Sequence, residues 1–443
     1  MHESYIYNIV SASKLFYYYI IVAITFFYIS YKYRNDLVSQ LIILCFYSGL
    51  TAYFGKTIEN PYKIFLVLLS LYLALKFNLL GILKDCNKNE RRVIYSFILF
   101  SFSFFLSAIF NYDDFTLTFS QYGKYFTPFI LFLILSKYSK YATLELKYYG
   151  YLLLTLISIQ ITLSILKFFL MGVQESIVGS ISYVGGGVAS ILPILGFVLF
   201  WLVKKGKFNK LDWGYVFLLL FIGFVSNKRA IWFIFPLIII VFTVYIPGKL
   251  TLKRFSLMLL FAPLVFYLGV RINPTLNSGN QIWGEFDLEY VLNYAKVYSF
   301  GENLEQDLGS GRGGATLLLF DNIVDSDNYS TKNILGYGLT PMYTKDYNVF
   351  DKNAFGINSK GAVTGFFQSY ISAGYLGILL TLFYSITLLF CIRDKNIRNI
   401  LLAYFLWDYF FYSGLILQTQ SLSILLIYII YISNDERAKI IAQ

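Results

Sequence analysis

The 443-residue sequence is poor in the side chains that most often bind metals or transfer protons. Its one histidine is His2, which excludes a histidine-based metal cluster and an internal histidine base. The three cysteines, Cys45, Cys86 and Cys391, form no CxxC pair, so we expect neither a thiol redox site nor a zinc knuckle. No Gly-Lys-Ser/Thr follows the glycine run at 185–187, which excludes a nucleotide-binding P-loop there.

Charged residues are also scarce, at 14% of the chain against roughly 25% in a soluble domain. Residues of the AVILMFWYC set reach 57%, and the mean hydropathy is +0.61. These values exclude a soluble multi-domain protein and predict a polytopic membrane protein. A net charge of +11 also occurs in chains that bind nucleic acid, but in a membrane protein it first indicates cationic loops that hold the spans in place. We therefore expect membrane lipid, and no nucleic acid, as a partner.

Long apolar runs recur along the chain. Because about 20 apolar residues cross the ~30 Å hydrocarbon core, the runs predict an all-α, polytopic integral membrane protein. We count about 13 candidate spans, with about 12 as the alternative. They lie near 10–31, 37–54, 62–83, 93–110, 118–136, 148–171, 185–203, 212–226, 230–246, 254–271, 362–391, 398–413 and 417–433.

The loops between these runs alternate in their content of lysine and arginine, regularly from about residue 84 onward. By the positive-inside rule the rich loops are cytoplasmic, the C-terminus lies inside and the N-terminus lies outside. Lys56 and Lys63 do not fit this scheme, because they fall in a predicted outer loop. The rich loops lie at 32–34, 84–92, 137–147, 204–210, 249–254 and 393–398.

One outer loop, at 272–361, is far longer than an ordinary connection of about 4–6 residues. It is net acidic, while the whole chain is net basic. The stretches 286–300 and 315–324 have the apolar spacing of short amphipathic helices. Such loops are usually lids or binding elements. We predict three parts: transmembrane helices over 1–271, the large outer loop over 272–361 and C-terminal transmembrane helices over 362–443.

Lys228 and Arg229 are the strongest candidates for functional residues in the chain. They lie in Ser226-Asn227-Lys228-Arg229-Ala230, a tight turn on the predicted outer side, where the positive-inside rule disfavours cations. An arginine near the bilayer is costly unless it is paired or hydrated, and its bidentate guanidinium suits a phosphate or a diphosphate. The alternative is an arginine that extends to the lipid headgroups.

Arg312 is the second candidate, in Gly309-Ser310-Gly311-Arg312-Gly313-Gly314 of the outer loop. The glycines let the backbone approach a ligand closely and leave N–H groups for an anion. We expect a helix to begin just after it, at Ala315, where the helix N-terminus would favour negative charge. The alternative is a flexible turn whose arginine is solvated or paired to a loop carboxylate.

Four ionisable residues lie in or at the ends of apolar runs: Arg271, Asp408, Lys76 and Lys167. An intramembrane charge is a functional candidate by default, although extension to the interface or a structural pair explains such residues equally well. Arg271 ends a span at the outer boundary. Gly336-Tyr337-Gly338 has the composition of a turn.

These landmarks, in their order along the chain, resemble the superfamily of bacterial O-antigen polymerases and O-antigen ligases, over roughly residues 210–400. Residues 226–230 resemble the family's Ser-Arg-Gly turn, and Ser310-Gly311-Arg312 resembles its Ser-Gly-Arg element. The stretch 336–339 resembles its Gly-x-Gly-Leu turn. Phe367-Gln368 through Gly374-Tyr375-Leu376-Gly377 resembles the start of the span after the large loop.

The resemblance implies a GT-C-like fold in the bacterial inner membrane and an inverting glycosyl transfer at the periplasmic face, with no metal and no cofactor. The implied substrates are undecaprenyl-diphosphate-linked oligosaccharides, and the implied partners are a chain-length regulator and a flippase. Ligases of the family carry a His-Asn pair shortly before the glycine that matches Gly374. Here those positions are Val363 and Thr364, which favours a repeat-unit polymerase over a ligase.

A lipid-linked oligosaccharide flippase is the alternative from another class, but it has short loops on both faces and internal symmetry, and neither is found here. For the polymerase, preorganised cations would stabilise charge on the leaving diphosphate. The base is unassigned among the loop carboxylates. We assign Arg229 and Arg312 to catalysis, and Lys228, Arg271, Gly311, Gly313, Lys360 and Gln368 to substrate binding.

Overall fold

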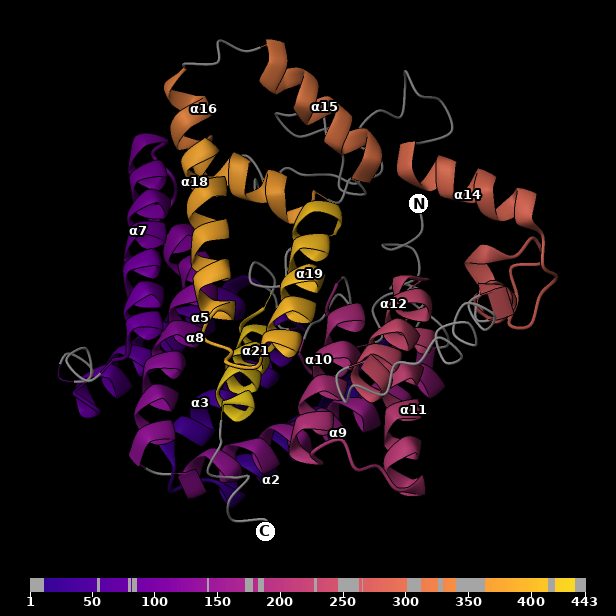
Figure 1. The fold of residues 1–443 in the computed structure, drawn as a ribbon, viewed down its shortest axis with the longest axis horizontal. Helices are drawn as coiled ribbons and strands as arrows, with labels where there is room; N and C mark the ends of the chain where they lie inside the picture. The colour runs from indigo at the N-terminus through magenta and orange to yellow at the C-terminus, as the bar shows by residue number, and fades with distance from the viewer. Residues whose placement is uncertain are drawn as a thin grey trace. The chain divides into compact units, whose positions relative to one another are not determined.

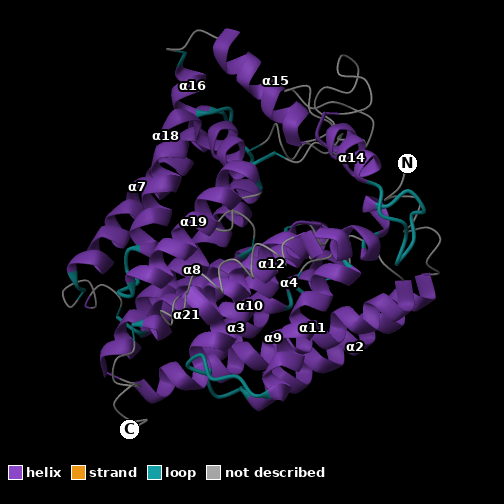
Figure 2. Cartoon of the chain, turned by 45° about the vertical axis from the view of Figure 1, so that its right-hand side comes forward, coloured by secondary structure: helices purple, strands orange, loops and turns teal. Residues whose placement is uncertain are grey.

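In the computed structural model, the described residues form helices joined by turns and loops, and they contain no strand (Figure 2). These residues are 12–53, 56–78, 81, 86–141, 143–171, 178–181, 187–226, 229–245, 263–264, 266–300, 312–325, 330–339, 363–412 and 419–434.

The helices lie where the apolar runs predict them, and two further helices, α14 and α15, lie at the predicted positions within 272–361. The N-terminal helices are α2 (Ala12–Lys32), α3 (Leu37–Phe46), α4 (Ser48–Tyr53), α5 (Lys56–Lys76), α7 (Lys88–Phe110), α8 (Phe115–Tyr141) and α9 (Thr143–Met171). The next are α10 (Val188–Val203), α11 (Lys210–Val225), α12 (Arg229–Ile240), the π-helical η1 (Val241–Tyr245), the 3-10 turn η2 (Pro274–Leu276), α14 (Leu288–Phe300) and α15 (Arg312–Asp325). The last are α16 (Thr331–Leu335), α18 (Gly365–Leu389), α19 (Lys395–Phe411) and α21 (Gln420–Ser433).

Four of the described helices are long and apolar enough to cross a membrane, over Ile58–Lys76, Lys88–Phe110, Leu146–Leu170 and Gly365–Leu389. Shorter apolar helices lie at Phe16–Lys32, Leu37–Phe46, Val188–Val203, Ile234–Thr243 and Gln420–Ser433. These helices confirm the prediction of a helical membrane protein. The number of crossings stays a prediction, and most of the candidate span at 254–271 lies outside the described residues.

The chain forms two compact units. Unit 1 contains Met1–Phe77, Ile130–Val291 and Thr419–Gln443, and unit 2 contains Asn78–Phe129 and Leu292–Gln418. Two of the four boundaries fall within α8 and within α14, and each unit is described by itself. The three-part division into membrane helices, outer loop and C-terminal helices stays a prediction.

Unit 1 contains a break between α3 and α4 that the sequence did not predict, since the run at 37–54 was expected to form one span. The break leaves backbone groups without helical partners, and a buried non-helical stretch at 178–181 bonds to them. Ser180 Oγ donates to Phe46 O at 3.0 Å, and Gly49 N–H donates to Ser180 O at 2.9 Å. Gln160 Oε1 accepts the Ser180 N–H at 2.6 Å. Non-helical backbone at membrane depth is stable where protein surrounds it in this way.

The helices α10 and α21 of unit 1 are buried along almost their whole length. Two hydroxyl groups tie α21 to helices that are distant in sequence. Tyr428 Oη donates to Leu146 O of α9, and Ser421 Oγ donates to Cys45 O of α3 at 3.3 Å. These bonds join polar side chains to backbone carbonyls inside an otherwise apolar bundle.

The helices α7 and α18 lie side by side in unit 2 (Figure 1). α7 begins with a capping box, in which Asn87 Oδ1 accepts the Glu90 N–H and a Glu90 carboxylate oxygen accepts the Asn87 N–H. Further along α7, the Ser96 and Thr387 hydroxyl oxygens lie 2.7 Å apart and join it to α18. This bond joins the first half of α7 to the last turns of α18, and the C-terminal end of α7 lies near the first half of α18, where Ser107 Oγ donates to Ser372 O.

Candidate functional site

The candidate site is built around a break in α18 at Ala373 and Gly374. Ala373 has φ −150° and ψ 21°, and Gly374 has φ 66° and ψ −156°. The left-handed φ of Gly374 is one that glycine adopts without steric cost. In Figure 1 the first segment of α18 runs across the view toward the end of α19, and the second runs down beside α7. The break therefore turns the chain near the end of α7.

Two carbonyl groups just before the break are bonded by other elements of unit 2. Tyr337 N–H donates to Ile371 O at 2.8 Å. Ser107 Oγ of α7 donates to Ser372 O at 2.6 Å. A buried carbonyl without a partner costs about 1–3 kcal/mol, so these two bonds stabilise the broken conformation.

Residues Gly336–Leu339, which we call the docked turn, follow α16 and pack against the break. Gly336 has φ 85° and Gly338 has φ 80°. A Cβ on Gly336 would lie 2.5 Å from Ala373 N, and a Cβ on Gly338 would lie 2.5 Å from Asp113 Oδ2. Both positions therefore require glycine, for backbone conformation and for close approach. The turn expected at 336–338 is present, and its docking on α18 could not be read from its composition.

The loop after α7 holds the docked turn from the other side. Asp113 Oδ2 accepts the Leu339 N–H at 2.7 Å. Asn111, the C-cap of α7, donates from Nδ2 to Gly336 O at 3.1 Å. Neither residue was predicted from the sequence, in which this loop stands out only for its lack of lysine and arginine. The available signal was an asparagine and two aspartates directly after a span, which are residues that bond to neighbouring backbone.

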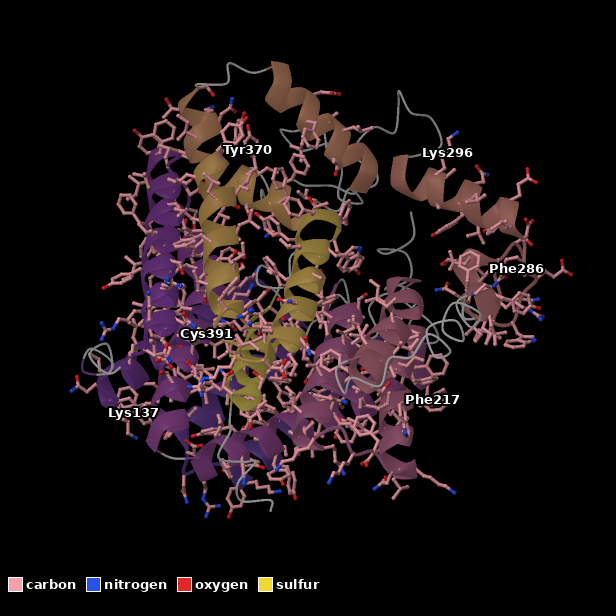
Figure 3. All side chains as sticks on the ribbon, in the orientation of Figure 1. Lys137, Phe217, Phe286, Lys296, Tyr370 and Cys391 are labelled. Carbon is pink, nitrogen blue, oxygen red and sulfur yellow. The ribbon has the colours of Figure 1, made fainter. Side chains whose placement is uncertain are left out.

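A buried hydrogen bond also joins α16 to α18. The Tyr370 hydroxyl donates to Asn333 Oδ1 at 2.7 Å, and both side chains are buried. Figure 3 labels Tyr370, which lies on the first segment of α18 near α16. Because α16 leads directly into the docked turn, this bond also fixes the position of that turn.

The helix α15 brings Arg312 into the same unit. α15 begins at Arg312 itself, and not at Ala315 as the sequence predicted. The Phe320 ring packs edge-on against Phe367 of α18, with ring centroids 5.2 Å apart. The N–H groups of a helix's first turn have no partner inside the helix, so this end of α15 favours an anion. The buried cluster between α15 and α18 contains Ala315, Leu319, Phe367, Tyr370, Ile371 and Ile378.

Other candidate residues of unit 2 lie on the same elements. Gly313 is half-buried in the first turn of α15, and Gln368 is half-buried on the first segment of α18. Gly365 N–H donates to Tyr412 O at 3.2 Å, so the end of α19 adjoins the start of α18. Asp408, one turn before the end of α19, is fully buried. α15, α18 and α19 therefore place Gly313, Gln368 and Asp408 within one unit.

The remaining assigned residues are not brought together by the described structure. Lys228, Gly311 and Lys360 lie outside the described residues. Arg229 begins α12 of unit 1, and Arg312 begins α15 of unit 2. The description does not extend to either arginine side chain, so the two-arginine clamp stays a prediction.

Arg271 of unit 1 is held by groups of its own chain. Its Nε–H donates to Gly284 O at 2.9 Å, and its Nη1 donates to the Tyr267 hydroxyl at 2.9 Å. The guanidinium carbon also lies 4.8 Å from the centroid of the Trp283 ring. These contacts give Arg271 a role in fixing the turn that follows its helix, and its assignment to substrate stays a prediction.

The two lysines in apolar runs differ in their surroundings. Lys76 is the last residue of α5 and is exposed, as expected for a lysine that extends to the membrane surface. Lys167 of α9 is buried, with Nζ 5.5 Å from the centroid of the Tyr18 ring. Of these two lysines, only Lys167 therefore remains a candidate for a charged residue inside a membrane span.

The sequence matches no protein-family model, and no curated protein or solved structure is significantly similar to it.

Proposed function

We propose that this chain is an oligosaccharide repeat-unit polymerase of bacterial surface polysaccharide synthesis. A hydroxyl oxygen of the terminal sugar on one lipid-linked repeat unit attacks the anomeric carbon of a glycan on undecaprenyl diphosphate. The new C–O glycosidic bond forms with inversion as the bond to the diphosphate breaks. The electron pair of that bond stays on the diphosphate, and the hydroxyl proton passes to a carboxylate of the outer loop.

One observation carries this proposal: three of the four motif regions of the family resemblance belong to one packed unit. α15 begins at Arg312, the docked turn lies on the α18 break, and the stretch from Phe367 to Gly377 forms that break. The turn at 336–339 and the stretch at 367–377 are in direct contact, because Tyr337 N–H donates to Ile371 O. The third region adjoins them through the helix that begins at Arg312, whose Phe320 ring packs on Phe367. Short motifs that match a family by chance need not pack together, so this packing supports the proposal.

Stabilisation of the leaving group explains the choice of residues in this proposal. The departing diphosphate gains negative charge, and preorganised cations and helix N–H groups stabilise such charge. Arg312 at the start of α15 and Arg229 at the start of α12 supply the cations. Gly311 and Gly313 allow close backbone approach to the phosphates. Loss of one such contact raises the barrier by roughly 3–4 kcal/mol, by analogy with a lost oxyanion-hole donor.

The other substrate contacts of the proposal come from Lys228, Lys360 and Gln368. The reaction takes place at the periplasmic face of the inner membrane, where lipid-linked repeat units present their sugars. A flippase supplies these units, and a chain-length regulator sets the length of the product. No metal or cofactor takes part in the proposed transfer.

Purified protein mixed with lipid-linked repeat units tests the proposal. A ladder of products that differ by one repeat unit is the expected result. Transfer of glycan only to a lipid A core acceptor would instead assign the ligase activity. Translocation across proteoliposomes without a new glycosidic bond would assign the flippase activity, and either result would overturn the proposal.

A further inference from the structure

An exposed apolar surface lies at the start of the loop that follows Arg271, within unit 1. Its exposed large apolar side chains are Tyr267, Ile282, Trp283, Phe286 and Leu288, which we together call the outer apolar patch. Trp283 is 53% exposed, and Ile282 and Leu288 are each 50% exposed. Exposed apolar side chains that lie together mark sites of interaction with a membrane, a protein or a ligand.

The patch is joined to the end of a predicted span by aromatic contacts. The Phe286 ring packs on Tyr267 with centroids 5.3 Å apart, and on Phe266 with centroids 5.9 Å apart. Tyr267 and Phe266 belong to the helical segment that ends beside Arg271. The patch is therefore continuous with the outer end of a span, and Figure 3 labels Phe286 at this position.

Arg271 lies between two aromatic side chains of this surface. Its guanidinium carbon is 4.8 Å from the centroid of Trp283 and 5.6 Å from that of Tyr267. Tryptophan, tyrosine and arginine together are typical of the membrane interface, because their apolar parts enter lipid while their polar ends reach headgroups and water.

The turn that presents Trp283 is held by several hydrogen bonds of its own chain. Gly284 N–H donates to Arg271 O at 2.9 Å, opposite the bond from Arg271 Nε–H to Gly284 O. Asn277, which is fully buried, donates from Nδ2 to Asn273 O and to Gln281 O, both at 2.9 Å. Lipid insertion by this turn therefore needs little further ordering, which lowers the entropic cost of binding.

Trp283 itself has φ 68°, a left-handed conformation that is unusual for a bulky residue. A conformation of this kind persists where surrounding contacts fix it, and such positions cluster at functional sites. Here this backbone conformation holds a large indole ring at the surface. Packing of the turn alone does not explain why such a ring is exposed.

We propose that the outer apolar patch is a membrane-interface anchor that inserts into the headgroup region of the outer leaflet. Its partner is the lipid bilayer, with the guanidinium of Arg271 near the lipid phosphates. The exposed carboxylates of Glu285 and Asp287 alternate with the apolar residues and stay in water. The anchor fixes the first turn of the outer loop at the membrane surface, and it does not depend on the proposed enzyme activity.

Fluorescence of Trp283 tests the anchor in the full chain. Replacing the other four of the five tryptophans, Trp201, Trp213, Trp232 and Trp407, by phenylalanine leaves one reporter. The variant is placed in proteoliposomes of phosphatidylethanolamine and phosphatidylglycerol that carry spin-labelled lipids. We expect quenching to be strongest with a label near the headgroup, weaker with a label at the acyl-chain end, and weakest with aqueous iodide.

Strong quenching by iodide without quenching by either lipid label would overturn the anchor. A change of Trp283 emission on addition of a soluble oligosaccharide, without lipid quenching, would assign the patch to glycan binding and also overturn it.

A spin label at residue 288 gives a second test if the phenylalanine variant does not fold. The three native cysteines are buried, so Leu288→Cys and the matched control Glu285→Cys introduce the reactive thiols. At 288 the label should be more accessible to oxygen, which concentrates in lipid, than to a water-soluble nickel chelate. At 285 the order should be reversed, and equal behaviour at both positions would contradict the anchor.

Discussion

Asp113 Oδ2 accepts the backbone N–H of Leu339 at 2.7 Å, across a sequence separation of 226 residues. This bond joins the loop after α7 to the docked turn, which in turn bonds to α18 at its break. It therefore links three segments: the end of the candidate span α7, a turn of the predicted outer loop and the start of the candidate span α18.

Removal of the Asp113 carboxylate should loosen the docked turn. A hydrogen bond to a charged group contributes about 1.5–3 kcal/mol, so Asp113→Ala should lower stability by about that amount. Asp113→Asn keeps an acceptor oxygen, and it should retain part of the stability. Thermal unfolding of the purified protein in detergent measures both. Equal melting temperatures for wild type and Asp113→Ala would show that this bond does not stabilise the turn.

Substitution of Gly374 should disrupt the α18 break. A Cβ there would meet the carbonyl groups of Ile334 and Asn333, and a left-handed backbone costs about 1–2 kcal/mol for a residue with a Cβ. Gly374→Ala should therefore lower the melting temperature and the yield of folded protein.

Gly214→Ala is the matched control for this substitution. Gly214 lies in α11, and a Cβ there meets nothing within 4 Å. Since alanine favours a helix over glycine by about 0.5–1 kcal/mol, this variant should equal or exceed wild type in stability. Similar losses in both variants would mean that the effect is not specific to the break.

Arg229→Ala and Arg312→Ala should each abolish long-chain surface polysaccharide in cells while the protein stays in the membrane. Loss of a charge-stabilising donor slows a reaction by about 10²–10³-fold, which is enough to remove long products. Gel electrophoresis of the polysaccharide and immunoblotting of membranes measure the two quantities. Arg92→Ala, at an exposed arginine of a predicted cytoplasmic loop, is the control and should leave chain length unchanged. Normal chain length in both test variants would refute the assignment of these arginines.

The predicted orientation can be tested by labelling lysines in intact cells. A membrane-impermeant amine reagent should modify Lys228 and Lys360 from outside, because both lie in predicted outer segments. Lys207, in a predicted cytoplasmic loop, should react only after lysis. Mass spectrometry of the labelled peptides gives the answer, and the reverse pattern would invert the topology.

The helical fold was readable from the sequence because apolar runs are local signals. The run at 93–110 corresponds to α7, and the run at 362–391 corresponds to α18, each within a few residues. The break between α3 and α4 was not predicted, since one tyrosine, one serine and one glycine at 47–49 within an apolar run do not by themselves end a helix. The groups that stabilise it, Ser180 and Gln160, come from distant parts of the chain.

The candidate site was readable only as separate motifs. Glycine and arginine spacing singled out Arg312 and the turn at 336–338, because conformational freedom and charge are properties of the residues themselves. The contacts of Asp113 and Asn111 were missed, since nothing local indicates which distant backbone group an acidic or amide side chain will bond. Arg271 was assigned to substrate binding, and its bonds to Gly284 and Tyr267 could be found only in three dimensions.

Polymerase activity is measured by counting the undecaprenyl diphosphate that purified protein releases from lipid-linked repeat units. One molecule of this lipid should be released for each glycosidic bond in the product ladder. Arg312→Ala should lose both release and ladder together, while Arg92→Ala should keep both. No release by the wild-type protein, or a full ladder from the Arg312→Ala variant, would refute the proposed polymerase.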